Sequence, residues 1–135
     1  RTLPGYMPVR PSVALCDVYK QNALQFVAES DWAEPTFMAG STDMGDLSHI
    51  MPAFEARARG ASGTGHGADY VISDPEMAYI APAKAAAMTL IDLLADGAAQ
   101  GKQILAGFKP EMTKDAYLEF MRGQAQEIIW KAEET

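Results

Sequence analysis

Few strands accompany many helical segments in this chain, and that imbalance limits what it can fold into. Residues 36–39 form a short apolar run that ends at Gly40, and residues 53–58 alternate apolar and polar side chains with the period of a strand. Two isolated strands form only a marginally stable pair in water. The sequence therefore predicts that further strands, supplied from elsewhere, complete the sheet.

Three segments have apolar residues at helical spacing. The first covers residues 11–28 and has a start signal in its first two positions, and the last covers residues 113–133 and can be capped by Thr113. The middle segment covers residues 82–96. Its expected buried stripe consists of Ala87, Leu90, Ile91 and Leu94.

Local signals set the expected ends of the middle helix. Asp74 followed by Pro75 resembles a capped helix start, but Pro82 should break or kink the helix that begins there. Gly97 stands where a C-terminal cap is needed, and a loop is expected from there to Pro110. The order helix, strand, strand, helix, helix has no internal repeat and belongs to the α/β or α+β classes.

Size, charge and cysteine content exclude several classes of protein. A chain of 135 residues fits one domain, residues 1–135, and its 48% hydrophobic and 21% charged residues are ordinary for a globular protein. Its net charge of −7 repels phosphate backbones and anionic membranes, so we expect neither nucleic acid nor a membrane as a partner. Its one cysteine suits a reducing compartment, and no apolar run approaches the roughly 18 residues of a membrane span. These features predict a cytoplasmic protein.

Two histidines are the candidates for metal binding. His66 stands between Gly65 and Gly67 in the glycine-rich loop of residues 60–67, where its ring is free to point into a cleft. His49 lies in a turn with no partner at ligand spacing, so a supporting or surface position suits it better. Because zinc sites use about three or four protein ligands, neither histidine alone predicts a metal site.

Three other features suggest a calcium site, a phosphate loop and a reactive cysteine, but each lacks residues that the function needs. Asp43 and Asp46 flank Gly45 as in a calcium loop, but the other oxygen ligands are missing, so hydrogen bonds to backbone amides are the better interpretation. The glycines of residues 60–67 suggest a phosphate loop, yet no Gly-Lys-Ser or Gly-Lys-Thr follows. Cys16 lies on a helix and is expected to be a buried small hydrophobe.

Two segments carry a more specific resemblance. Residues 37–48 read Phe-Met-Ala-Gly-Ser-Thr-Asp-Met-Gly-Asp-Leu-Ser, and residues 65–70 read Gly-His-Gly-Ala-Asp-Tyr ahead of an alanine-rich helix. Together they resemble the C-terminal part of the catalytic domain of M20 metal-dependent amidohydrolases and peptidases, in the branch of aminobenzoyl-glutamate and N-acyl-amino-acid hydrolases. The likeness covers about residues 3–96.

The resemblance implies a partial three-layer α/β catalytic domain, to which this chain supplies three main helices and two or three short strands. The N-terminal half of that domain and an inserted lid domain are then expected upstream, with residues 1–7 as the return from the lid. The start of the chain agrees with this expectation, because it has no initiator methionine and no signal pattern. The rest of its own chain is then its main partner, and we also expect a homo-oligomer.

The resemblance also implies roles for single residues. His66 matches the last ligand of a dinuclear zinc or manganese site. Gly40, Ser41 and Thr42 match a loop whose backbone amides hold a substrate carboxylate, and Asp43 matches an acid that braces the loop. No residue here matches the family's other ligands or its general base, so no catalytic residue is assigned, and we expect these 135 residues alone to be inactive and metal-free.

Three functions stay open at this point. The first is a C-terminal segment of a hydrolase that cleaves the amide bond of N-acyl-amino acids or aminobenzoyl-glutamate-like substrates. The second is a non-catalytic, acidic small-molecule-binding module that keeps the loop and needs no metal. The third is nucleotide binding by residues 60–67, which has the weakest support.

Overall fold

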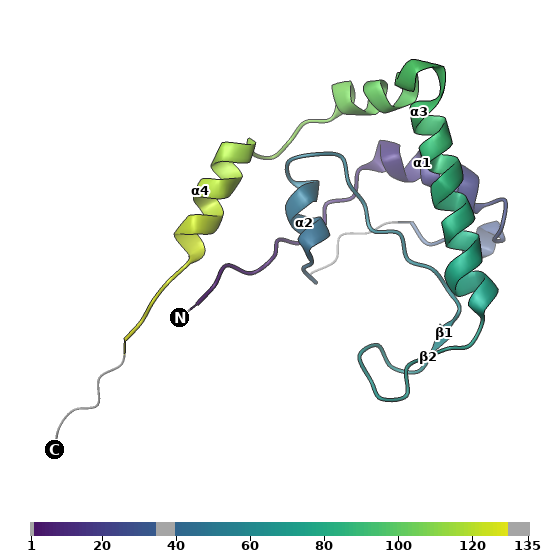
Figure 1. Cartoon of the computed structure of the whole chain (residues 1–135), viewed down its shortest axis with the longest axis horizontal. Helices are drawn as coiled ribbons and strands as arrows, with labels where there is room; N and C mark the ends of the chain where they lie inside the picture. Colours follow the sequence, from purple (N-terminus) through teal and green to yellow (C-terminus); the bar gives the residue numbers. More distant parts are fainter. Residues whose placement is uncertain (1, 35–39, 130–135) are drawn as a thin grey trace.

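The computed structural model describes residues 2–34 and 40–129 (Figure 1). Its elements are α1 (Val13–Ala23), η1 (Glu29–Asp31), α2 (Asp43–Ser48), β1 (Ala61–Ser62), β2 (Val71–Ile72), η2 (Glu76–Ile80), α3 (Ala81–Gly107) and α4 (Lys114–Gln124). This mixture of helices with a small sheet agrees with an α/β protein at a coarse level. The strand predicted at residues 36–39 lies outside the described residues.

The chain is open rather than closely folded on itself. Its accessible surface is 9944 Å², whereas a compact monomer of 14.6 kDa exposes roughly 6,900 Å². The core is correspondingly small. Its buried centre and the partly buried side chains around it are Tyr19, Ala23, Ala85, Phe26, Trp32 and Phe54.

Helices α1 and α3 cross at this core and are joined by the amide of Asn22. Its Nδ2 lies 2.7 Å from Oδ2 of Asp92 and 3.3 Å from Oγ1 of Thr89, and it also donates to the carbonyl of Val18 at 3.2 Å. Thr89 Oγ1 donates to the carbonyl of Ala85 at 2.8 Å. Because Asn22 and Thr89 are buried, losing these bonds would leave polar groups unsatisfied.

The stripe of α3 that was predicted to be buried is exposed. The helix turns Ala81, Ala85 and Thr89 inward, one turn apart, because small side chains let α1 approach closely. Its large aliphatic residues lie on other faces. Ala87 is exposed, and Leu90, Ile91 and Leu94 are 59%, 66% and 68% exposed.

The helical segment changes type next to Pro82, as expected, and the regular helix begins at Ala81, one residue before the predicted start. Pro82 follows the π-helical turn η2 and occupies the second residue of α3, near the start where a missing N–H is tolerated. The predicted helix start at Asp74 is confirmed, because its Oδ1 accepts a hydrogen bond from the amide of Met77 at 3.1 Å.

α3 changes direction where Gly97 was predicted to cap it (Figure 1). Asp96, Gly97 and Ala98 have φ of 49°, 68° and 62°, so three consecutive residues are left-handed. The predicted cap at Gly97 is confirmed. The predicted loop up to Pro110 is wrong over its first part, because the chain returns to helix and stays helical to Gly107.

The segment Glu76–Gly107 is a described helix long and apolar enough, by length and composition only, to cross a membrane. The expectation that no stretch comes near that limit is therefore wrong. Core helices of soluble proteins pass the same test, and 17% of the most apolar window is buried here.

The only ladder in the described part of the chain is the β1–β2 hairpin, in which Ala61 faces Ile72 and Ser62 faces Val71. Residues 60–67, predicted to be a loop, therefore contain the first strand of a hairpin and part of its turn. Residues 53–58, predicted to be a strand, have no ladder partner among the described residues.

Helix α2 holds the N-terminal segment of the chain. Oδ1 of Asp46 accepts a hydrogen bond from the amide of Met7 at 2.8 Å, and Oγ of Ser48 accepts one from the amide of Arg10 at 3.0 Å. A Cβ on Gly45 would lie 1.7 Å from the carbonyl oxygen of Met7, so this contact requires glycine. The helical turn predicted at residues 47–51 thus begins earlier, at Asp43.

Helix α4 lies near the same N-terminal segment (Figure 1). Its predicted cap is confirmed, since Oγ1 of Thr113 accepts from the amide of Ala116 at 3.2 Å. The helix ends at Gln124, nine residues before the predicted end. Thr2 and Gln126 then exchange two backbone hydrogen bonds of 2.7 and 3.0 Å.

Candidate functional site

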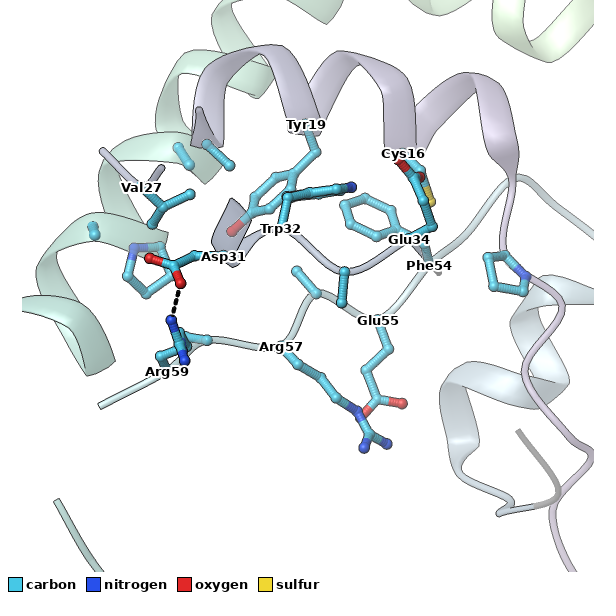
Figure 2. A pocket seen from close by; sticks show the side chains of 18 of the residues that line it. Cys16, Tyr19, Val27, Asp31, Trp32, Glu34, Phe54, Glu55, Arg57 and Arg59 are labelled. Atoms are coloured by element: carbon cyan, nitrogen blue, oxygen red, sulfur yellow. Dashed lines mark hydrogen bonds and ion pairs between the residues drawn. The ribbon is translucent and has the colours of Figure 1, made fainter. Parts of the chain in front are cut away.

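An open cavity of about 660 Å³ lies beside α1, and we call it the α1 cavity (Figure 2). Tyr19, Trp32 and Phe54 form an aromatic wall. The ring centroids of Tyr19 and Phe54 are 5.2 Å apart, and those of Tyr19 and Trp32 are 6.4 Å apart. A cavity of this size with aromatic walls is typical of small-molecule sites.

The predicted substrate loop lines this cavity. Gly40, Ser41 and Thr42 are part of its wall. Ser41 forms a backbone bridge with Pro8, so the loop is tied to the N-terminal segment. Asp43 is not part of the wall; it begins α2, and its Oδ1 accepts from the amide of Met44 at 3.0 Å. This is the backbone bonding expected of a turn-forming acid.

Charged side chains surround the aromatic wall. Asp31 pairs with Arg59, and Glu34 pairs with Lys20. The hydrogen bond from Lys20 lowers the pKa of the Glu34 carboxyl. Arg57 makes no ion pair with any described residue, and Figure 2 shows it pointing away from the aromatic wall.

The indole of Trp32 carries a buried N–H beside the cavity. Its Nε1 has no acceptor in good hydrogen-bond geometry among the described residues, although the indole contributes, after Lys20, to lowering the pKa of Glu34. Lys20 Nζ also lies 5.7 Å from the centroid of the Trp32 ring. A buried donor without a well-placed acceptor is positioned to bind an oxygen atom of a ligand.

His66 lies away from the α1 cavity, at the end of the β1–β2 hairpin, and it is exposed. The amide of Gly67 donates to the carbonyl of Thr64 at 2.7 Å, which closes a tight turn with His66 as its third residue. The φ of His66 is +63°, a left-handed conformation that glycine adopts more readily. The structure therefore does not bring His66 together with Gly40, Ser41 and Thr42.

The described donors do not make a metal site by themselves. No group of three or more His, Cys, Asp or Glu side chains that could hold an ion occurs within residues 2–34 and 40–129. Asp69 is the carboxylate nearest in sequence to His66, and it is used to close the loop, because it accepts from the amide of Thr64 at 3.2 Å. His66 fits a site only as one ligand among others.

His49 has a structural position. Its side chain is 9% exposed, and its Nε2 lies 3.1 Å from the carbonyl oxygen of Pro8, to which it donates. Its own carbonyl accepts from the amide of Glu111 at 3.0 Å. His49 therefore connects α2 to the N-terminal segment and to the segment before α4, as a supporting residue would.

Cys16 is a buried thiol on the wall of the α1 cavity. Burial, followed by the charge of Asp17, raises its pKa from 9.0 to about 11. The thiol is therefore neutral at physiological pH, as expected for a small hydrophobe rather than a nucleophile.

Sequence reasoning missed the aromatic wall. Tyr19 was assigned only to a helix face, and Phe54 only to a strand. Trp32 was assigned to no helix or strand. One signal was available: a large aromatic residue on each of three neighbouring segments is a frequent composition for a small-molecule site.

Comparison with protein-family models, curated proteins and solved structures finds no significant match to this chain.

Proposed function

We propose that this chain supplies the cleft wall and one metal ligand of an M20-type metal-dependent amidohydrolase that acts on acylated amino acids. The observation that carries the proposal is the position of Gly40, Ser41 and Thr42 on the wall of an aromatic cavity of about 660 Å³. A cavity of this kind suits an apolar acyl group, and the adjacent loop amides suit a carboxylate.

The conformation of His66 supports its role as a ligand. A histidine with φ of +63° between two glycines is strained where glycine would not be, and strained residues concentrate at functional sites. Zinc or manganese is the metal expected from the resemblance. The bound metal would supply Lewis-acid activation of the amide. The other ligands and the general base must come from polypeptide other than these 135 residues.

The remaining parts of the proposal are a cytoplasmic location and a substrate bound between this wall and the rest of the enzyme. This chain's residues bind and orient in that scheme: the aromatic wall holds the acyl group, and the Gly40 to Thr42 loop holds the carboxylate. The neutral, buried Cys16 agrees with a reducing compartment but does not require one.

The test uses the full reading frame that contains this chain. Hydrolysis of N-benzoylglycine with added zinc or manganese is expected, and His66→Ala should lower kcat/KM by at least about 100-fold because one metal ligand is lost. Lys109→Ala, an exposed change on the segment before α4, is the control and should have no effect. Full activity of His66→Ala would refute the proposed role.

A non-catalytic binding module is the second candidate, and the buried indole N–H of Trp32, which has no well-placed acceptor among the described residues, favours it. Titration calorimetry of the isolated chain with N-benzoylglycine, with and without a chelator, separates the two candidates. Binding that is unchanged by the chelator supports the module. Nucleotide binding has less support, since residues 60–67 belong to a hairpin and the next helical element, η2, begins only at Glu76.

A further inference from the structure

α3 bends at three consecutive residues whose backbone is left-handed. Asp96, Gly97 and Ala98 have φ of 49°, 68° and 62°, and regular helix lies on both sides of residues 95–98. The left-handed conformation strains Asp96 and Ala98, because each carries a Cβ, and it leaves only Gly97 unstrained. Strain of this kind persists only where contacts elsewhere in the structure fix it.

Packing at the bend does not compensate for this strain. A Cβ added to Gly97 would meet no atom within 4 Å, so the bend is open on this side. Within residues 96–126, all of which the structure describes, no residue is buried. The bent form of α3 is therefore held by the contacts that the chain makes beyond the bend.

The chain beyond the bend, residues 98–126, attaches to two parts of the molecule (Figure 1). We call these residues the C-terminal arm. The amide of Glu111 donates to the carbonyl of His49, the residue that follows α2, across 3.0 Å. The carboxylate of Glu111 forms an ion pair with Arg10 of the N-terminal segment. The arm therefore contacts α2 and the N-terminal segment through one residue.

Helix α4 and the end of the arm add further contacts. Burial and the charge of Asp46 raise the pKa of Tyr117, so this phenol lies beside the carboxylate that also accepts the amide of Met7. Thr2 and Gln126 exchange two backbone hydrogen bonds. All of these contacts end on α2 or on the N-terminal segment.

The same two parts of the molecule hold the loop of residues 40–42 at the α1 cavity. Thr42 directly precedes α2, and its carbonyl accepts from the amide of Gly45 at 2.9 Å. Ser41 forms a backbone bridge with Pro8 of the N-terminal segment. A movement of α2 or of the N-terminal segment therefore moves the loop.

We propose that α3 has a bent and a straight state, and that the C-terminal arm couples them to the loop of residues 40–42. In the bent state the arm is docked and the loop is fixed. In the straight state residues 95–98 are helical, the strain is lost, the arm leaves and the loop loosens. The ion pair of the arm is half exposed and contributes little, so the two states lie close in free energy. The coupling does not depend on the amidohydrolase activity; only its consequence for substrate binding rests on the proposed function.

Native-state hydrogen exchange of the 135-residue chain tests the coupling at single amides. Gly97→Ala adds a Cβ that meets no atom, strains the bent state and favours the straight helix. The amide of Glu111 reports docking of the arm, and that of Gly45 reports the loop; both should exchange at least about fivefold faster. Gly107→Ala also meets no atom within 4 Å, and Gly107 is not left-handed, so this control should change neither amide.

A disulfide separates release of the arm from local damage at the bend. In a Cys16→Ala background, Thr2→Cys with Gln126→Cys should form one, because residues that exchange two backbone hydrogen bonds have Cα atoms roughly 5.5 Å apart. In the oxidised chain Gly97→Ala should no longer accelerate exchange at Gly45. After reduction the acceleration should return.

In the full reading frame, Gly97→Ala should raise the KM for N-benzoylglycine by at least about threefold and change kcat less, since the loop binds the substrate and does not react. A full chain without hydrolase activity would refute the proposed function and leave the exchange result standing. Three exchange results would each overturn the coupling: equal effects of Gly97→Ala and Gly107→Ala, faster exchange at Glu111 but not at Gly45, or an acceleration that persists in the disulfide-linked chain.

Discussion

The backbone amide of Met7 donates to Oδ1 of Asp46 across 2.8 Å, although 39 positions separate the two residues in the chain. Around this bond Ser48 and His49 hold Arg10 and Pro8, so α2 fixes the whole N-terminal segment with side-chain acceptors and donors. The loop at the α1 cavity precedes α2 directly. Its position therefore depends on how firmly α2 holds that segment.

Gly45→Ala should disrupt this arrangement. The added Cβ would lie 1.7 Å from the Met7 carbonyl oxygen and 2.7 Å from its carbonyl carbon, so the N-terminal segment must move away. We expect a loss of at least about 2 kcal/mol in the free energy of unfolding, measured by urea denaturation. Gly5→Ala, which meets nothing within 4 Å, is the control and should change little. Equal losses in both variants would contradict the close contact.

His66→Gly should stabilise the isolated chain. At φ of +63° glycine is not strained, so we expect a gain of about 1 kcal/mol by urea denaturation. His66→Ala keeps the left-handed strain and should give no such gain. In the full reading frame both variants should lose activity. A loss of stability in His66→Gly would show that the imidazole itself holds the hairpin.

Because α3 bends at residues 96–98, substitution by glycine should change the free energy of unfolding in opposite directions at Ala98 and Ala99. Ala98→Gly replaces a residue with φ of 62° and should stabilise the chain by about 1 kcal/mol. Ala99→Gly replaces a residue in regular helix and should destabilise it by about 0.5–1 kcal/mol. Thermal unfolding followed by circular dichroism measures both. Effects of the same sign would argue for an unbroken α3.

The two faces of α3 should respond differently to substitution. Ala85 is 1% exposed, so Ala85→Leu overpacks the contact with α1 and should cost about 1–3 kcal/mol. Ile91 is 66% exposed, so Ile91→Gln should stay within about 0.5 kcal/mol of the original chain. Urea denaturation at low protein concentration compares them. A large loss of unfolding free energy in Ile91→Gln would indicate that Ile91 is buried, as the sequence predicted.

Alkaline pH should lower the free energy of unfolding because it ionises Cys16 more readily in the unfolded chain. Its pKa in the folded chain is about 11 and its ordinary value is 9.0, so the folded state keeps a proton that the unfolded state has lost between these pH values. The stabilisation is complete below pH 9 and is lost as the pH rises through about 11. The loss should be on the order of 2 kcal/mol.

The measurement compares the original chain with Cys16→Ala at pH 8 and pH 10.5. Burial also raises the pKa of Tyr19, but that residue is present in both proteins and cancels in the difference. Rapid alkylation of the folded thiol at pH 8 would contradict its burial.

Signals that act within one helical turn predicted the structure well. Ser12 precedes α1, Asp74 caps the helical start, Thr113 caps α4, and Gly97 adopts the left-handed conformation of a helix end. These outcomes depend on a few neighbouring backbone groups, which the local sequence specifies.

Predictions that depend on a partner surface were less successful. The face that α3 buries is decided by α1, which presents Tyr19 and Asn22 and therefore receives small and polar residues rather than Leu90 and Ile91. Strand character in residues 53–58 was read from periodicity, but a ladder needs a neighbour that the described chain does not provide. Gly101 was placed in the predicted loop up to Pro110, whereas it lies in the second helical stretch of α3, close to the carbonyl of Leu93.

Some residues of the candidate site could likewise be predicted from local sequence, and others could not. The motif residues Gly40, Ser41 and Thr42 could be named from the sequence, and the structure places them at a cavity. Trp32 could not, because its importance comes from a wall built by segments far apart in the chain. The distance of His66 from this cavity likewise depends on how the β1–β2 hairpin is oriented, which no local pattern states.

The pairing of Thr2 with Gln126 sets an order for folding during synthesis. The second residue of this segment finds its backbone partner only after almost all of these residues have left the ribosome, and contacts between such distant positions form slowly. A translation product shortened before Gln126 would lack this last connection, and the N-terminal segment would then be held by α2, by the Pro8–Ser41 bridge and by the hydrogen bond from Ser12 to Ala53.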